Sequence, residues 1–417
     1  MATPAPALTQ RRDPKRLVSL SNTPFLGRLA MVNHYMAMVD KLSATSQFPA
    51  LAAFLPKNLI PWVSSYLKFA FTKKFKFPDY TGKVSNGIYP LSPAGSSTVT
   101  LAIAGDWATG TKESAQIAQH MCDKNSDWTI HLGDVYYVGD ETEVNENCLG
   151  ITEHGFAGVK WPHGARGSFA LNGNHEMYAN GTAYFTKFLT TLGPEGDPEH
   201  QPASFFCLDS EHWRIIAVDT GYNSVGVPLL SQVPGLKSIA AIGGDCHLQP
   251  EILTWLRDVV KPHQVQKATL LLSHHQYFSA FEQRYPKPAN QIADLFKGQE
   301  LVWIWGHEHR LAIYDKFNPD GILTAYGRCL GHSGMPPETG KPKHANVPLK
   351  FYDPRSSKLE GSDVGVNGYL VATINGKALT LEYRDLADTV LFVETFTPGA
   401  NGSLEQVFEN KGLVKPT

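Results

Sequence analysis

The sequence has few cysteines, no excess charge of either sign and no long apolar run. Its five cysteines stand singly, without a Cys-x-x-Cys pair, which favours free thiols and a reducing compartment over a disulfide framework. Lysine and arginine number 37 against 39 acidic residues, so the charge gives no reason to expect nucleic acid as a partner. No apolar stretch approaches the roughly 18 residues of a membrane-spanning helix.

A secretory signal is also missing, because Arg11 and Arg12 have no apolar core behind them. We therefore expect a cytoplasmic protein, although a secreted chain that has lost its signal would look the same. The sequence gives no indication of the oligomeric state.

The chain is long enough to bury a substantial core, and it is rich in residues that form loops. It has 417 residues, of which 36 are glycine and 28 are proline, while only 18 % are charged. This composition is typical of a loop-rich enzyme and not of a helical scaffold. We expect one large catalytic domain with an extension.

Five short clusters hold residue types that bind metals, and each follows a run of apolar, strand-forming residues. A single cluster would be weak evidence, because Gly-Asp and His-His pairs are common in loops. Polar residues at the carboxyl ends of buried strands, however, are where layered sheets place their active sites. The clusters are Gly105-Asp106-Trp107, Gly133 to Tyr137, Gly173 to Glu176, Leu271 to His274 and Gly306 to His309.

In order and spacing the clusters resemble the motifs of the calcineurin-like metallophosphoesterases, and most closely those of the purple acid phosphatases. The wider superfamily usually has Asp-x-His in the first motif, but here Ala108 stands where that histidine would be. Tyr137 stands three residues after Asp134, where purple acid phosphatases have a tyrosine. The resemblance spans roughly residues 98 to 330, with a closing sheet to about residue 395.

This resemblance implies two metal ions, iron together with zinc, manganese or a second iron. Imidazole and carboxylate suit these metals, and the clusters contain no thiolate ligand. A carboxylate between two cations offsets their repulsion, and the pair clamps the attacking and leaving oxygens at phosphorus. The implied ligands are Asp106, Tyr137 and His309 for one ion and Asn174, His274 and His307 for the other, with Asp134 bridging.

The resemblance also implies roles in catalysis. The nucleophile would be a metal-bound hydroxide, and bridging Asp134 counts with the catalytic residues. His175 is the candidate to contact the phosphoryl group or to protonate the leaving oxygen. Tyr136 is expected to pack in the core, because the spacing of the motif selects Tyr137. Glu308 is expected to point away from the ligands on either side of it.

Three further residues are candidates for the substrate pocket. His275 follows a ligand and could fix its orientation, since ligand histidines need partners. Arg284 lies in the loop after the fourth motif, and His332 lies in a Gly-His-Ser-Gly turn. For both, the match to the family is only positional.

The implied activity is hydrolysis of phosphate monoesters, with a small phosphorylated molecule as substrate. One alternative is a manganese or zinc phosphodiesterase acting on nucleotides or phospholipid head groups. Another is a non-catalytic binding protein that uses the same scaffold. All seven expected ligands are present, so the sequence shows no sign of a decayed site.

The expected fold class is α/β: a two-sheet β-sandwich flanked by helices, with an N-terminal helical extension. Residues 1–97 would form the extension or cap, 98–397 the catalytic domain and 398–417 a tail. Within the extension we expect helices at 27–42 and 61–74. Residues 61–76 mix aromatics with lysines; they could touch a membrane surface, but docking on the catalytic domain is the simpler expectation.

Within the catalytic region the hydrophobic pattern predicts particular elements. Strands are expected before each cluster, and Asn375-Gly376 predicts a hairpin turn between residues 369–374 and 378–383. Two long segments, 221–249 and 331–363, are expected to be loops at the rim of the site. The remaining expected elements are helices at 112–124, 249–261 and 290–297 and strands at 204–209, 213–218 and 390–397.

Overall fold

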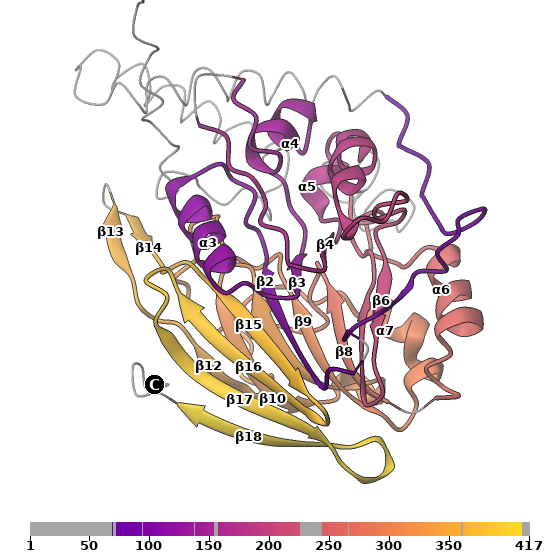
Figure 1. Ribbon diagram of the computed structural model, residues 1–417. Helices are drawn as coiled ribbons and strands as arrows, with labels where there is room; N and C mark the ends of the chain where they lie inside the picture. Colours follow the sequence, from indigo (N-terminus) through magenta and orange to yellow (C-terminus); the bar gives the residue numbers. More distant parts are fainter. Residues whose placement is uncertain are drawn as a thin grey trace, which may run out of the picture.

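Two stacked sheets form the centre of the molecule, with helices over both outer faces (Figure 1). The computed structural model describes residues 69, 72–93, 95–136, 138–153, 157–225, 244–265, 267–359 and 362–410. The expected helix at 27–42 and nearly all of that at 61–74 lie outside these residues, as does most of the loop at 221–249. The expected α/β sandwich flanked by helices is confirmed.

The first sheet has, within the described residues, eight strands in the order β1-β6-β7-β8-β9-β11-β10-β12. Strands β7, β8, β9 and β11 run parallel, and β6 and β10 run antiparallel to their neighbours β7 and β11. The bounds are β1 Ile88–Pro90, β6 Phe206–Asp209, β7 Trp213–Ala217, β8 Ala268–Ser273, β9 Glu300–Trp305, β10 Leu311–Phe317, β11 Thr324–Leu330 and β12 Leu349–Tyr352.

The second sheet likewise has eight strands among the described residues, in the order β18-β17-β16-β15-β2-β3-β4-β5. Strands β2, β3 and β4 are parallel, and β15 to β18 form an antiparallel meander. The bounds are β2 Thr98–Ala104, β3 Trp128–His131, β4 Gly167–Ala170, β5 Gly193–Pro194, β15 Gly368–Asn375, β16 Ala378–Asp385, β17 Val390–Pro398 and β18 Leu404–Asn410.

The expected strands before the five clusters are present as β2, β3, β4, β8 and β9, and the Asn375-Gly376 hairpin joins β15 to β16. The expected loop at 331–363 instead contains β12 and β13 (Ser357–Leu359), and β13 pairs with β14 (Ser362–Val364). These strands are short and lie at sheet edges, where a proline-rich segment can still form hydrogen bonds with the one neighbouring strand. Strands β1 and β18 lie before and after the expected range 98–397.

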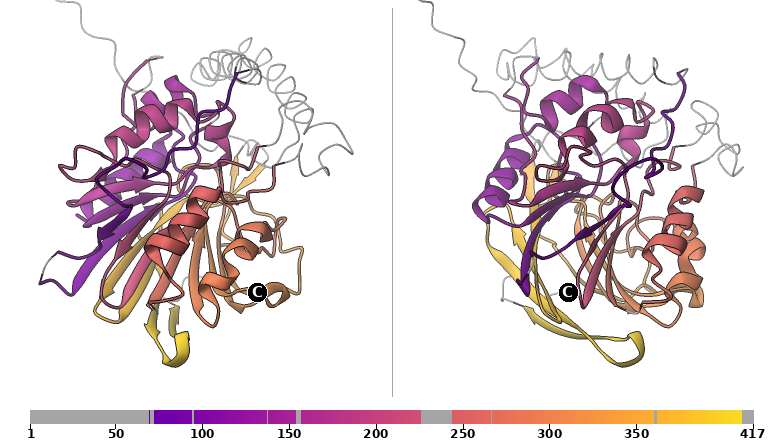
Figure 2. Two further views of the ribbon diagram at one scale, coloured as in Figure 1. Left: turned by 90° about the vertical axis from the view of Figure 1, so that its right-hand side faces the viewer. Right: turned by 45° about the vertical axis from the view of Figure 1, so that its right-hand side comes forward.

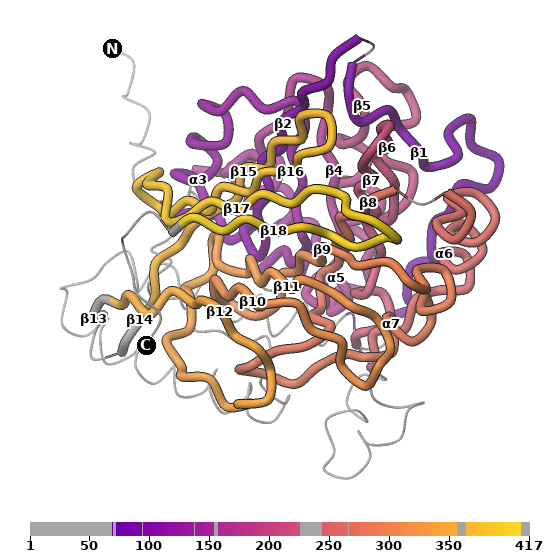
Figure 3. The backbone as a smooth tube through the Cα atoms, turned by 90° about the horizontal axis from the view of Figure 1, so that it is seen from below, coloured from indigo at the N-terminus to yellow at the C-terminus, as the bar shows by residue number. Residues whose placement is uncertain are grey.

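Apolar side chains fill the space between the sheets and beneath the helices. Figure 2 shows the two sheets facing each other, and in Figure 3 strands β15 to β18 run beside β9 to β12. Phe396 of β17, for example, packs edge-on against Tyr326 of β11 at 5.1 Å. Alternating burial along β16 shows that one face of this sheet turns towards that core.

The flanking helices cover the outer faces. α3 (Lys112–Asp123), α4 (Glu141–Asn147) and α5 (Asn174–Met177) pack on the sheet of β2 to β4. α6 (Pro250–Trp255) and α7 (Pro286–Ile292) pack on the sheet of β7 to β9. α7 begins four residues before the expected helix, because prolines are tolerated in a first turn whose N–H groups have no intrahelical partner. None of the described helices is long and apolar enough to cross a bilayer.

The described residues before β1 pack against later parts of the chain. The Phe75 N–H donates to the carbonyl of Asn180, and Tyr222 Oη donates to the carbonyl of Phe75. Phe77 is buried and stacks on Phe205 at 5.9 Å. Aromatic side chains of residues 72–87 thus dock on the segments around Asn180, Phe205 and Tyr222.

Candidate metal centre

Six of the seven expected ligands meet where strands of both sheets end. Asp106 and Asp134 follow β2 and β3, and Asn174 opens α5 after β4. His274 follows β8, and His307 and His309 follow β9. The parallel strands direct their carboxyl ends towards one edge of the sandwich, so residues some 200 positions apart become neighbours. All six side chains are buried.

The backbone at this edge is strained. Asp106, Asp134 and His307 have φ values of 56°, 73° and 65°, in the left-handed region that side chains other than glycine seldom occupy. Such conformations cost about 1–3 kcal/mol each and cluster at functional sites, where they aim a side chain that the regular strand would direct elsewhere.

Four donor atoms converge at a first position. Tyr136 Oη lies 2.6 Å from Asp106 Oδ1 and 2.9 Å from His309 Nε2. His309 Nε2 lies 3.3 Å from Asp106 Oδ1. Oδ2 of Asp134 lies 3.1 Å from the same tyrosine oxygen. Two carboxylates, an imidazole and a phenol could hold a hard or borderline cation here.

Four donor atoms also converge at a second position. Asn174 Oδ1 lies 3.2 Å from His274 Nε2 and 2.9 Å from His307 Nδ1. The other oxygen of Asp134, Oδ1, lies 3.3 Å from His274 Nε2. Asp134 therefore directs one carboxylate oxygen to each position, as a bridging carboxylate can do.

Glycines leave the space that these carboxylates occupy. A Cβ on Gly173 would lie 2.1 Å from Asp134 Oδ1, and one on Gly306 would lie 2.5 Å from Asp106 Oδ2. Any larger residue at either position would displace a carboxylate. Gly173 and Gly306 are thus explained by the close approach of the backbone to the ligand side chains.

Tyr136 lies at the first position, which corrects the expectation that it packs in the core. Tyr137, the residue selected by the motif spacing, lies outside the described residues. Tyr136 faces the site after the left-handed turn at Asp134, a placement that the motif spacing alone does not indicate.

Charges at the centre balance one another. Burial raises the pKa of Asp134, but the positive charges of His274 and His175 bring it well below its usual value. Burial lowers the pKa of His274, but the charge of Asp134 outweighs this and raises it to about 10. Burial and the neighbouring His274 lower the pKa of His307 to about 3. The carboxylates thus attract positive charge, from protons or from a cation.

Further contacts orient the ligands. His274 Nδ1 lies 2.8 Å from the carbonyl of Leu132, which leaves Nε2 to face the second position. Glu308 turns away from the donor atoms, as expected, and accepts a hydrogen bond of 2.8 Å from Ser279.

His175 lies beside the bridging carboxylate. Its backbone N–H donates to Asp134 Oδ1 at 3.0 Å, and its Nε2 is 3.7 Å from Asp134 Oδ2. The ring lies against that of Tyr136 at 4.3 Å. A group here could reach a substrate oxygen held between the two positions.

The three substrate-pocket candidates differ in their placement. His275 packs on His307 at 4.4 Å, and its Nδ1 lies 3.1 Å from Thr220 Oγ1. Arg284 pairs with Asp320 at 2.7 Å, at the rim of a separate pocket of about 630 Å³. His332 is buried, with Nε2 beside the backbone of Gly368.

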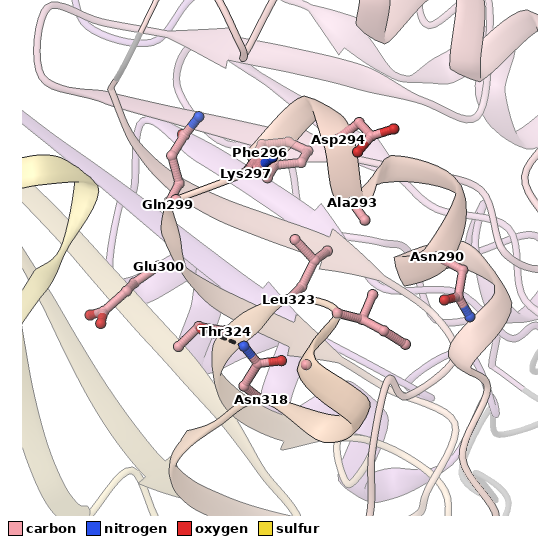
Figure 4. A pocket seen from close by; sticks show the side chains of 13 residues that line it. Asn290, Ala293, Asp294, Phe296, Lys297, Gln299, Glu300, Asn318, Leu323 and Thr324 are labelled. Carbon is pink, nitrogen blue, oxygen red and sulfur yellow. Dashed lines mark hydrogen bonds between the residues drawn. The ribbon is translucent and has the colours of Figure 1, made fainter.

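Another pocket, of about 540 Å³, lies at the opposite ends of β9 and β11 (Figure 4). It is lined by Asp294, Lys297 and Glu300 among others, and Asn318 bonds to Thr324 at its wall. Glu300 opens β9 whereas the histidines follow its last residue, so this pocket is not part of the metal centre.

Comparison with known proteins indicates the same class of protein, a metal-dependent phosphoesterase, as the geometry of the site does. The calcineurin-like phosphoesterase family matches residues 99–311, just over half of the chain. The chain therefore belongs to the calcineurin-like phosphoesterase family, a family of metal-dependent phosphoesterases. A comparison with curated proteins found no match.

The solved structures that this chain matches have little sequence identity to it. PhoD is 13 % identical with a TM-score of 0.49, covering 78 % of this chain and 74 % of that one. GAP50, the anchor in the inner membrane complex of Plasmodium, is 13 % identical with a TM-score of 0.43, covering 71 % and 87 %. Vps29 of Chaetomium thermophilum is 11 % identical with a TM-score of 0.24, covering 76 % and 98 %.

Proposed function

We propose that this protein is a purple acid phosphatase-like enzyme that hydrolyses phosphate monoesters with two metal ions. The observation that carries the proposal is that two sets of donor atoms share Asp134, with one oxygen facing each set. A single-ion site has no need of such a carboxylate. We further propose iron for one ion, because a phenol oxygen is among the donors, and zinc, manganese or iron for the other.

Two bound cations would lower the pKa of water and offset negative charge on the phosphoryl group. The residues of this chain supply the rest. Asp134 holds the two positions together, and its contact with the His175 N–H fixes the start of α5. His175 would donate a proton to the leaving oxygen or hold a phosphoryl oxygen, since its imidazole lies beside Asp134.

The five cysteines are all free, and four of them are buried. They therefore support the proposal that the protein works in a reducing compartment such as the cytoplasm.

The test compares p-nitrophenyl phosphate with bis-p-nitrophenyl phosphate on protein whose metal content has been measured. We expect about two ions per chain and faster hydrolysis of the monoester. The His175→Ala variant should keep both ions while kcat falls roughly 100-fold, because proton transfer contributes about that much.

His212→Ala is the matched control, since His212 is partly exposed beside Glu211 in the turn between β6 and β7. It should behave as wild type. Faster cleavage of the diester would replace the proposed substrate class. Two bound ions with no hydrolysis of either ester would refute the enzymatic function and favour a binding role.

A further inference from the structure

The amide of Asn174 has a defined orientation. Only its oxygen carries lone pairs for a cation, so a flipped amide would turn its NH2 group towards the metal. The oxygen faces His274 and His307, and Nδ2 donates to Tyr178 Oη at 3.2 Å. The hydroxyl of Tyr178 therefore holds the amide with its oxygen towards the second position.

Tyr178 is well placed for this task. It is the C-cap of α5, four residues after Asn174, so both side chains lie on the same side of the turn. Tyr178 is 8 % exposed, and its ring packs edge-on against His175 at 5.0 Å. The hydroxyl is thus held by packing as well as by its hydrogen bond.

The orientation of His307 must also be fixed, since an imidazole has two nitrogens and only one of them can face the metal. Nδ1 faces the second position, 2.9 Å from Asn174 Oδ1, and Nε2 faces Tyr285 Oη at 3.5 Å. A ligand nitrogen must present its lone pair, so the ring proton must lie on the other nitrogen. Tyr285 Oη is the acceptor on that side, and it is itself held by Gln283 Nε2 at 2.6 Å.

We propose that Tyr178 and Tyr285 are positioning residues that orient Asn174 and His307 and thereby set the affinity of the second metal position. The inference rests on the proposed function, because it requires two separate ions. Both tyrosines lie outside the five motifs, and each contacts a donor of the second position. The first position has its own phenol, that of Tyr136.

The experiment titrates metal-free protein with Mn²⁺ and measures the free ion by electron paramagnetic resonance. Tyr178→Phe and Tyr285→Phe keep the ring and remove only the hydroxyl. We expect each variant to bind one ion as wild type does and the other roughly tenfold more weakly or worse, the usual effect of losing a partner of a metal ligand.

Tyr184→Phe is the control. Tyr184 is also buried and also follows α5, but its hydroxyl bonds to the carbonyl of Ala170. It should bind two ions with wild-type affinities. Thermal melting of the metal-free variants separates a local effect from a loss of fold, and if Tyr178→Phe melts early the Tyr285→Phe variant decides.

Two results would overturn the inference while leaving the proposed function intact: wild-type affinity for both ions in both variants, or equal weakening of both ions. A wild-type protein that binds fewer than two Mn²⁺ ions would overturn both proposals together. The Mn²⁺ titration of the wild-type protein therefore distinguishes failure of this inference from failure of the proposed function.

Discussion

The hydroxyl of Tyr136 donates a 2.6 Å hydrogen bond to Oδ1 of Asp106, inside a site where Asp134 and His309 are also within reach. Burial and the two carboxylates raise the pKa of Tyr136 well above its usual value, so without a cation the phenol keeps its proton. A ferric ion would reverse this, because it binds the phenolate.

We therefore predict that Tyr136→Phe removes the visible iron–phenolate absorption of protein reconstituted with iron. The variant should also bind the first ion at least roughly tenfold more weakly, since an anionic donor is lost. Tyr137→Phe is the comparison variant, because the motif spacing predicts Tyr137 as the ligand; if Tyr136 binds the iron, this variant should keep the colour. A colourless Tyr137→Phe beside a coloured Tyr136→Phe would assign the role to the tyrosine that the motif spacing selects.

The second prediction concerns a substitution at Gly173. Its φ of −104° suits any residue, so a side chain is excluded by the close approach of an added Cβ to Asp134, 2.1 Å from Oδ1 and 2.7 Å from the backbone nitrogen. Gly173→Ala should displace the bridging carboxylate and weaken both ions by roughly tenfold or more. Isothermal titration with Mn²⁺ measures this.

Gly340→Ala is the matched control, because an added Cβ there has no atom within 4 Å. It should bind Mn²⁺ as wild type does. Unchanged binding by Gly173→Ala would mean that Asp134 does not occupy the bridging place.

A third prediction concerns the ion pair that joins the two sheets. Arg328 of β11 contacts Glu394 of β17 through two hydrogen bonds of 2.6 and 2.7 Å, and both side chains are buried. Arg328→Met leaves a buried carboxylate without its cation and should lower the free energy of unfolding by about 3–5 kcal/mol. Urea unfolding of the metal-free protein measures the loss.

Arg257→Met is the comparison, since Arg257 pairs with Asp258 in solvent and its loss should leave the urea midpoint unchanged. Restored stability in the double variant Arg328→Met with Glu394→Leu would attribute the loss to the stranded charge. Equal midpoints for wild type and Arg328→Met would show that the pair contributes no stability.

Local patterns in the sequence predicted much of the fold. Runs of apolar residues located the strands before each cluster, and the Asn375-Gly376 turn located the β15–β16 hairpin, because both signals arise from neighbouring residues. The pairing of β1 with β6 and of β18 with β17 was not predictable in this way, since it depends on which edge strand each segment reaches.

The candidate site was likewise predictable only where the signal comes from neighbouring residues in the sequence. The sequence predicted that Asp106, Asp134 and His307 lie at one edge of the sheets, because each follows a buried strand. The position of Tyr136 depends on a left-handed turn, and the contact of Tyr285 with His307 joins two segments 22 positions apart. Neither has a signature in residue spacing. The Arg328–Glu394 pair, 66 positions apart in sequence, has none either.

The protonation of His274 gives the last prediction. Burial lowers its pKa, but Asp134 raises it to about 10, so in metal-free protein near neutral pH the imidazole is charged. Its Nδ1 faces the carbonyl of Leu132, and Nε2 must lose its proton before a cation can bind there. His307, with its pKa lowered to about 3, is already neutral and releases none.

Mn²⁺ binding at the second position should therefore release about one proton from His274 and tighten by about tenfold per pH unit below its pKa. Calorimetric titrations near pH 6.5 and 7.5, each in two buffers of different ionisation enthalpy, measure both quantities. Binding that neither strengthens with pH nor releases a proton would show that His274 is neutral before the cation arrives, and that Asp134 does not hold a positive charge on it.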